Sequence, residues 1–153
     1  MISERVLGNI NQIKTDDKII NVPFEWFEVE KKRIAKIADD GTEIGVICKG
    51  DVLNDGDILA KQDNKIYVVK IKPSHLIKID VKSIKEMGRL CFELGNRHLS
   101  LKIEENAVYI PYDEPTFLYL KKLGFNANSI DEVFNGFIQC KAHGASKHSH
   151  HHE

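Results

Sequence analysis

The fold of the C-terminal half is decided by one stretch, Ile77-Lys78-Ile79-Asp80-Val81-Lys82-Ser83-Ile84-Lys85-Glu86. Its first part alternates apolar and charged side chains, which is the pattern of a β-strand with one buried face. Ser83 and Glu86 then have the spacing of a capping box, in which each side chain accepts a hydrogen bond from a free amide at the start of a helix. The stretch therefore predicts a strand that passes directly into a helix.

The residues that follow extend this pattern. Apolar residues at helical spacing continue to Leu94, and Gly95 is expected to take the left-handed conformation that ends the helix. Two further strands, a second helix and a last strand come next, so we expect a ferredoxin-like βαββαβ domain over residues 74–140. The expected bounds are 99–103 and 107–110 for the two strands, 113–124 for the second helix and 133–138 for the last strand.

The N-terminal part, residues 1–73, is predicted to be a small all-β domain. Asp-Gly pairs and other turn residues separate short apolar runs, and no helical period lies between them. The sequence Lys72-Pro73-Ser74 marks the boundary with the next domain. The fold class is therefore α+β, with a flexible His-rich tail at 141–153. Strands are expected at 6–10, 19–22, 33–38, 43–48, 58–60 and 66–71.

The composition limits the kinds of partner. The chain has 153 residues, 42% of them hydrophobic, and a net charge of -1 with both signs interspersed. Such a balance gives no field that would attract nucleic acid or an anionic membrane, so neither is expected. We find no apolar run long enough to span a membrane and no apolar signal core. The widely spaced cysteines fit reduced thiols, and we expect a cytoplasmic protein.

The histidines indicate a protein that handles metal ions. His98 lies between the first predicted helix and the next strand, so ordered backbone should hold it on both sides. Neutral imidazole nitrogens suit nickel, copper and zinc. One imidazole cannot hold a metal tightly, but a symmetric dimer would place two at its two-fold axis. The other candidate ligands lie in the tail and could complete the shell: His143, His148, His150, His151 and His152.

Other interpretations of the tail remain open. An expression tag would also be rich in histidine, although the run here is short and is interrupted by Ser149 and followed by Glu153. Cys140 and His143 have the Cys-x-x-His spacing of half a zinc site, whereas a closed structural site needs four ligands. Cys140 could thus add a thiolate to the metal shell.

Several motifs together resemble the UreE family, the urease accessory nickel metallochaperones. They are Gly95-Asn96-Arg97-His98, the preceding Leu90-Cys91-Phe92-Glu93-Leu94, the hairpin at 31–41, the Asn54-Asp55-Gly56-Asp57 turn and the His-rich end. The resemblance implies an N-terminal module like a chaperone peptide-binding domain and a ferredoxin-like C-terminal module. It also implies a homodimer that carries nickel(II) at its interface through His98 and C-terminal histidines.

The same resemblance implies partners and a departure. The partners would be the accessory GTPase UreG and the urease apoprotein assembly complex. Some family members have a peripheral His-x-His site at the entry to the second helix, but Tyr112 and Glu114 stand there in this sequence. That peripheral site is therefore not expected.

Several alternatives stay open. Zinc(II) or copper(II) could occupy the site, and metal could join two dimers into a tetramer. The chain could also be a metal storage or buffering protein, or an interaction module that binds a peptide and no metal. An enzyme is not expected, because the sequence has no nucleophile-base pairing, phosphate loop or paired acidic motif.

Overall fold

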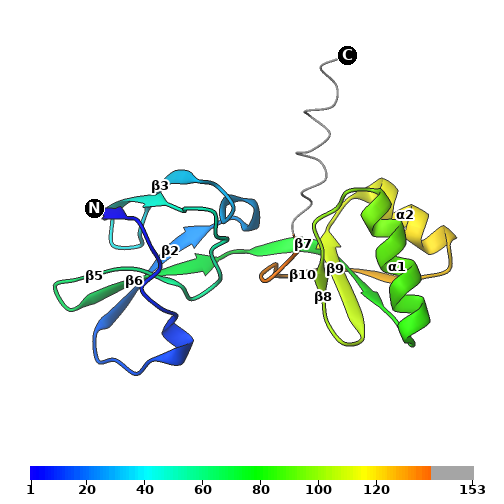
Figure 1. Cartoon of the computed structure of the whole chain (residues 1–153), viewed down its shortest axis with the longest axis horizontal. Coiled ribbons are helices and arrows are strands. Elements are labelled where there is room, and N and C mark those ends of the chain that lie inside the picture. Colours follow the sequence, from blue (N-terminus) through cyan, green and yellow to red (C-terminus); the bar gives the residue numbers. More distant parts are fainter. Residues whose placement is uncertain (139–153) are drawn as a thin grey trace, which may run out of the picture. The chain divides into compact units, whose positions relative to one another are not determined.

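The computed structural model describes residues 1–138, which form two compact units, Met1–Pro73 and the residues from Ser74 onward. Over these described residues the chain is an α+β protein made mostly of strands, with two α-helices in the second unit (Figure 1). Neither of these helices is long and apolar enough to cross a lipid bilayer. Cys140 and the histidines from His143 to His152 lie outside the described residues.

The first unit consists of two three-stranded sheets. Buried aliphatic side chains alternate along the strands, as in Ile44 and Val46, which are buried while Glu43 is exposed. The predicted hairpin is confirmed, with Ala35 opposite Gly45. The sheets have the orders β1(Ile2–Ser3), β4(Glu43–Ile47), β3(Arg33–Ile37) and β2(Lys18–Phe24), β6(Lys65–Ile71), β5(Ile58–Gln62).

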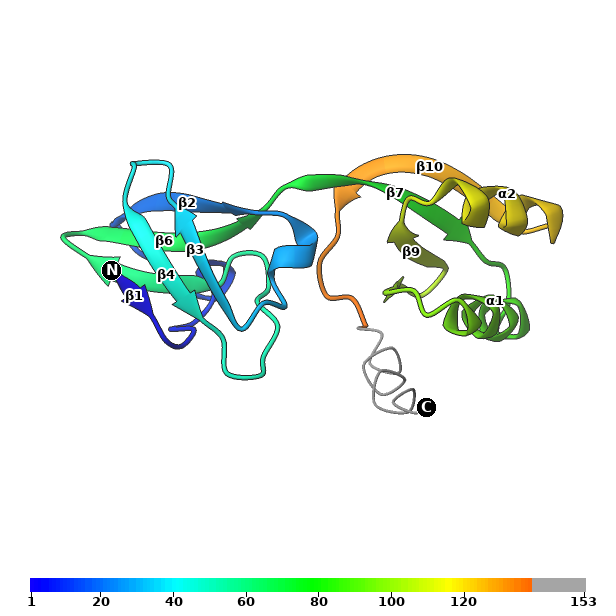
Figure 2. The same ribbon diagram turned by 90° about the horizontal axis from the view of Figure 1, so that it is seen from above.

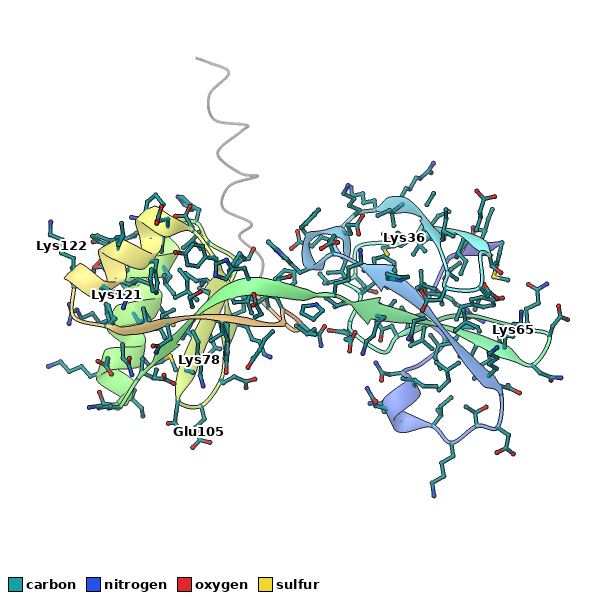
Figure 3. The ribbon with its side chains drawn as sticks, turned by 180° about the vertical axis from the view of Figure 1, so that it is seen from behind. Lys36, Lys65, Lys78, Glu105, Lys121 and Lys122 are labelled. Atoms are coloured by element: carbon teal, nitrogen blue, oxygen red, sulfur yellow. The ribbon has the colours of Figure 1, made fainter. Side chains whose placement is uncertain are left out.

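Polar side chains fix the turns of this unit. Asp63 and Asn64 both have positive φ angles, 52° and 60°, as a two-residue hairpin turn with the twist of its strands requires. Asp40 accepts hydrogen bonds from the Thr42 amide, the Tyr67 hydroxyl and Lys65 Nζ. These bonds, led by that of the Thr42 amide, hold the pKa of Asp40 well below its usual range. The Lys65 and Lys36 side chains of this unit are labelled in Figure 3.

The strand predicted at 6–10 is wrong. Leu7 donates a backbone hydrogen bond to Ile58, but Gly8 has a φ of 143° and the chain then turns. The Asn9 side chain accepts from the Asn11 amide and donates to the Asp55 carbonyl, which stabilises a 3-10 turn at Ile10–Gln12 in place of a strand. The apolar pattern of this segment does not predict the turn, because the turn depends on the side chain of Asn9.

The second unit has the predicted succession of strand, helix, strand, strand, helix and strand. Its sheet has the order β10-β7-β9-β8, and both helices pack on one face of it, against Ile77, Ile79 and Val108 (Figure 1). Ser83 accepts a hydrogen bond from the Glu86 amide, so the predicted start of the helix is confirmed. The elements are β7(Pro73–Asp80), α1(Ile84–Asn96), β8(Lys102–Ile103), β9(Ala107–Pro111), α2(Glu114–Lys122) and β10(Asn126–Val133).

The last strand lies earlier than predicted, at Asn126–Val133 rather than 133–138. β10 is an edge strand beside β7 (Figure 2), so the exposed Asn126 and Asn128 face water and do not interrupt it. On its other side Ala127 joins the core. The residues predicted as the strand form a return segment instead, in which Phe134 is fully buried at 0% exposure.

The return segment ends beside β8. Ile138 donates to the Leu101 carbonyl at 2.7 Å and accepts from the Leu101 amide at 3.2 Å. Phe134 stacks on Phe137 with ring centroids 4.8 Å apart. The chain therefore crosses from the β7 side of the sheet to its β8 edge, and Phe134 is the apolar anchor of that crossing.

We predict that Phe134→Ala lowers the free energy of unfolding by about 3–5 kcal/mol, since it removes a fully buried aromatic ring. Urea denaturation of the metal-free protein measures this change. The control is Ile138→Ala, which truncates a side chain that is 56% exposed and should cost less than about 1 kcal/mol. Equal losses in the two variants would contradict the anchoring role of Phe134.

Candidate metal site around His98

His98 occupies the turn that ends helix α1. The helix continues to Asn96, so the prediction that Gly95 ends it in a left-handed conformation is wrong. His98 takes that conformation itself, with a φ of 55°. Its amide donates to the Gly95 carbonyl at 3.0 Å, and the Leu99 amide reaches the Leu94 carbonyl at 3.5 Å. These two bonds form a Schellman motif, with histidine at the position where glycine is usual.

Apolar contacts on both sides of His98 hold this turn. Leu94 is buried in the core and Leu99 packs against the same core cluster, which is the hydrophobic contact that accompanies such a motif. Leu101, three residues after His98, is buried as well. His98 itself is exposed. The backbone is thus anchored while the residue that carries the imidazole lies at the surface.

The residue before His98 is tied to helix α2. Arg97 Nε donates to Thr116 Oγ1 at 3.2 Å, and Thr116 Oγ1 donates to Asp113 Oδ2 at 2.6 Å. The Arg97 guanidinium also lies 5.0 Å from the ring centroid of Tyr119, whose hydroxyl donates to Glu93. The end of α1 is therefore connected to the beginning of α2.

Asp113 is the N-cap of α2 as well as the end of this chain of hydrogen bonds. It accepts from the side chain and the backbone amide of Thr116, and the nearby Arg97 charge adds to their effect, so its pKa is lowered. Because the pKa of Asp113 is lower in the folded protein, its charged form stabilises the fold, and this stabilisation is lost only as the pH falls below the ordinary pKa of an aspartate. The carboxylate thus stays ionised at neutral pH.

The outward face of α1 is apolar and leads to His98. Ile84 and Phe92 are 92% and 67% exposed, and Gly88 and Gly95 lie between and after them at the spacing of one helix face. A Cβ atom at either glycine would meet no atom within 4 Å. Two large exposed apolar side chains separated by glycine form a surface that another helix can approach closely.

The described part of the chain adds no second metal ligand to His98 that belongs to a three-ligand cluster. Within residues 1–138, no three histidine, cysteine or acidic side chains lie close enough to hold a metal ion, so His98 belongs to no three-ligand cluster in this part of the chain. Cys91 is half-buried, its thiol lies 3.8 Å from Met87 Sδ, and burial raises its thiol pKa. Cys48 is half-buried in the first unit, and burial raises its pKa too. A raised pKa keeps both thiols protonated, and neither belongs to a three-ligand cluster within residues 1–138.

His75 was missed by the sequence analysis. Its ring stacks on Tyr112 with centroids 4.0 Å apart, and its Nε2 lies 2.5 Å from Ser129 Oγ. The signal was present, because His75 continues the alternation of Ile77 and Tyr112 continues that of Ile110. Tyr112 is one of the two positions at which some UreE proteins have a peripheral His-x-His site. The pair of His75 and Tyr112 has a single imidazole and therefore does not form such a site.

We predict that His98→Gly raises the free energy of unfolding of the metal-free protein by about 0.5–1 kcal/mol, because glycine adopts positive φ without the steric cost of a Cβ atom. Urea denaturation with chelator present measures this change. His98→Ala keeps the Cβ atom and serves as the control, with little change expected. A loss of stability in His98→Gly would mean that the imidazole itself stabilises the fold.

Both units match known family models. The model of the UreE urease accessory protein N-terminal domain matches residues 3–72, and that of the C-terminal domain matches residues 74–153. The urease accessory protein UreE of Bifidobacterium longum subsp. infantis is 52% identical over 148 residues, 95% of this chain and 66% of the relative. That of Acetivibrio thermocellus is 37% identical over 154 residues, 99% of this chain and 100% of the relative.

A third relative is more distant but has similar coverage. The urease accessory protein UreE of Flavobacterium johnsoniae is 29% identical over 153 residues, 95% of this chain and 93% of the relative. The chain thus spans just under two thirds of the Bifidobacterium protein and all of the Acetivibrio protein. All three relatives are named as accessory proteins and not as catalysts, in agreement with the prediction that the chain is not an enzyme. The chain belongs to the UreE family of urease accessory proteins.

Proposed function

We propose that this protein is a cytoplasmic nickel metallochaperone, which binds nickel(II) between the His98 imidazoles of a homodimer and delivers it for assembly of the urease active site. The observation that carries the proposal is the place of His98, exposed in a fixed left-handed turn at the end of an apolar helix face. Because the backbone of His98 is already fixed, little conformational entropy is lost when this residue binds a metal ion.

The outward face of α1 supports the homodimer. An isologous contact along Ile84, Gly88 and Phe92 would bury apolar surface that is exposed in one copy. With the two-fold axis along the helices, this contact would bring the C-terminal ends of the two α1 helices together, and His98 lies three residues beyond Gly95 at that end. Two imidazoles from two copies then become the core of one metal site.

The course of the return segment supports a contribution from the C-terminal histidines. Ile138 pairs with Leu101, which is three residues from His98, so the residues after Ile138 start close to the site. His143 follows five residues later, and a fully extended segment of that length spans at most about 18 Å. His143, His148, His150, His151 and His152, with Cys140, are therefore candidate further ligands.

A site of this kind suits a carrier. It lies at the surface and depends on ligands from separate segments, so the metal can enter and leave. Affinity for nitrogen ligands rises from nickel to copper, so zinc(II) or copper(II) can compete, and selectivity must come from metal supply and partners. We propose UreG and the urease apoprotein assembly complex as the recipients. Metal bound by histidines of two dimers would give a tetramer.

The first unit favours a second, compatible role. An apolar hollow of about 330 Å³ lies on the outer face of the β1-β4-β3 sheet, over Ala35 and Gly45 and beside the exposed Ile2. β3 is an edge strand of that sheet, and an edge strand can accept another strand through backbone hydrogen bonds. We propose that this hollow binds an apolar segment of a partner protein, as the chaperone-like module of the family would.

For the metal site, we predict one tight nickel site per dimer in calorimetric titration, and its loss in His98→Ala with weak binding retained. The solution mass followed alongside reports the dimer. Binding should also weaken as the pH falls, because protons compete with the metal ion for the imidazole nitrogens. Wild-type stoichiometry and affinity in His98→Ala would refute the proposal.

The matched comparison is a chain ending at Cys140. It lacks the C-terminal histidines but keeps Phe134 and the pairing of Ile138 with Leu101. We expect fewer nickel ions bound and an unchanged melting temperature of the metal-free protein. If this truncation removes all tight binding while His98→Ala retains it, nickel is held by the tail and not by His98.

For the first unit, we predict that Ala35→Glu reduces capture of urease accessory proteins by the tagged chain, because it places a charge on the floor of the apolar hollow. Nickel affinity should stay at the wild-type value, since His98 belongs to the other unit. Undiminished capture would exclude the hollow as a partner surface.

A further inference from the structure

We infer that Arg97 is a positioning residue for His98, which it holds in the metal-binding geometry by linking the end of α1 to Thr116 and Asp113 on α2. This inference rests on the proposed function for the role of His98 in binding nickel. Its structural basis, the link between the two helices, is independent of any metal.

The direction of the hydrogen bonds is fixed by their chemistry. The Thr116 hydroxyl has one proton and donates it to Asp113 Oδ2 at 2.6 Å, so its oxygen lone pairs accept from Arg97 Nε at 3.2 Å. The order is therefore guanidinium to hydroxyl to carboxylate. Thr116 is only 1% exposed, so the hydroxyl at the centre of this link is buried, while Arg97 reaches it from the surface. A buried hydroxyl without both partners would be costly.

A second contact holds the same guanidinium from the side. It lies over the Tyr119 ring, and the Tyr119 hydroxyl donates to Glu93 Oε1 at 3.2 Å. Glu93 is on α1, one helical turn before Arg97. Arg97 is an exposed residue, but two residues of α2 contact its guanidinium and Tyr119 links back to α1, which limits the freedom of the Arg97 side chain.

The consequence for His98 follows from its backbone. The last turn of a helix frays readily, and a left-handed conformation of a residue with a Cβ atom persists only where its surroundings hold it. Arg97 is the C-cap residue, and its amide donates to the Leu94 and Gly95 carbonyls. Fixing its side chain to α2 keeps this cap in place, and His98 is the next residue. In a dimer two Arg97 side chains would act in this way, because the imidazoles of both His98 residues must bind the same metal ion.

The same helix supplies a matched control. Arg89 donates from Nη2 to the Leu123 carbonyl at 3.3 Å, and its guanidinium lies 4.9 Å from the Phe125 ring centroid. It therefore makes a hydrogen bond and a cation-π contact of the same kind as Arg97, two helical turns before the site. Arg89→Gln removes the same charge and similar contacts without touching the cap beside His98.

The test is nickel titration of four variants of the full chain. We expect Arg97→Gln and Thr116→Val to weaken the His98-dependent site about 10- to 100-fold, the usual effect of losing an outer-shell partner of a metal ligand. Arg89→Gln, and Thr116→Ser, which keeps the hydroxyl, should stay within about 2-fold of the wild type. Wild-type affinity in both Arg97→Gln and Thr116→Val, or an equal loss in Arg89→Gln, would overturn the inference.

A second readout separates positioning from general stability. Backbone chemical shifts of His98 in the metal-free protein report whether it keeps the left-handed conformation. We expect that conformation to be lost in Arg97→Gln and retained in Arg89→Gln, and its retention in Arg97→Gln would contradict the inference. If the wild type has no nickel site that depends on His98, the proposed function fails, and the chemical shifts still decide the role of Arg97. Should Thr116→Val not fold, Arg97→Gln alone carries the test.

Discussion

The hydrogen bonds that close helix α1 hold the candidate metal ligand in place. The His98 amide donates to the Gly95 carbonyl and the Leu99 amide reaches the Leu94 carbonyl, so the chain reverses within a few residues. Leu94 and Leu99 bury the apolar part of this turn against the core, and His98 remains exposed between them. A residue with a Cβ atom adopts a positive φ here at a cost in stability, which is expected where function and not folding selects the residue.

The elements that position this turn follow from local patterns. Alternation in 77–81 predicted β7, and the spacing of Ser83 and Glu86 predicted the start of α1, because both depend on neighbours in the sequence. Two predictions failed where the outcome depended on tertiary contacts. The last strand lies at Asn126–Val133 and not at 133–138, because Asn126 and Asn128 face water on an edge strand, where polar side chains are tolerated. The helix was predicted to end at Gly95, but it includes Asn96, because the packing of Leu94 and Leu99 against the core places the left-handed turn at His98.

In the candidate site too, some features follow from local sequence and others depend on tertiary contacts. His98 was predicted from its place between a helix and a strand, and the structure has it at that junction. The link from Arg97 to Thr116 joins residues 19 positions apart and exists only because α1 and α2 pack side by side, so no local pattern could reveal it. The stack of His75 on Tyr112 likewise joins two neighbouring strands. The C-terminal histidines were predicted from composition, and they stay candidate ligands on that ground and on the pairing of Ile138 with Leu101.

The central claim is that one nickel ion is shared by His98 of two copies. The most direct test is a crystal structure of the nickel-loaded protein, with the metal located by its anomalous scattering. We expect a nickel peak on a two-fold axis between the two His98 imidazoles, at the ends of two facing α1 helices. Nickel bound only by residues 140–153, with both His98 imidazoles far from any metal ion, would contradict the claim.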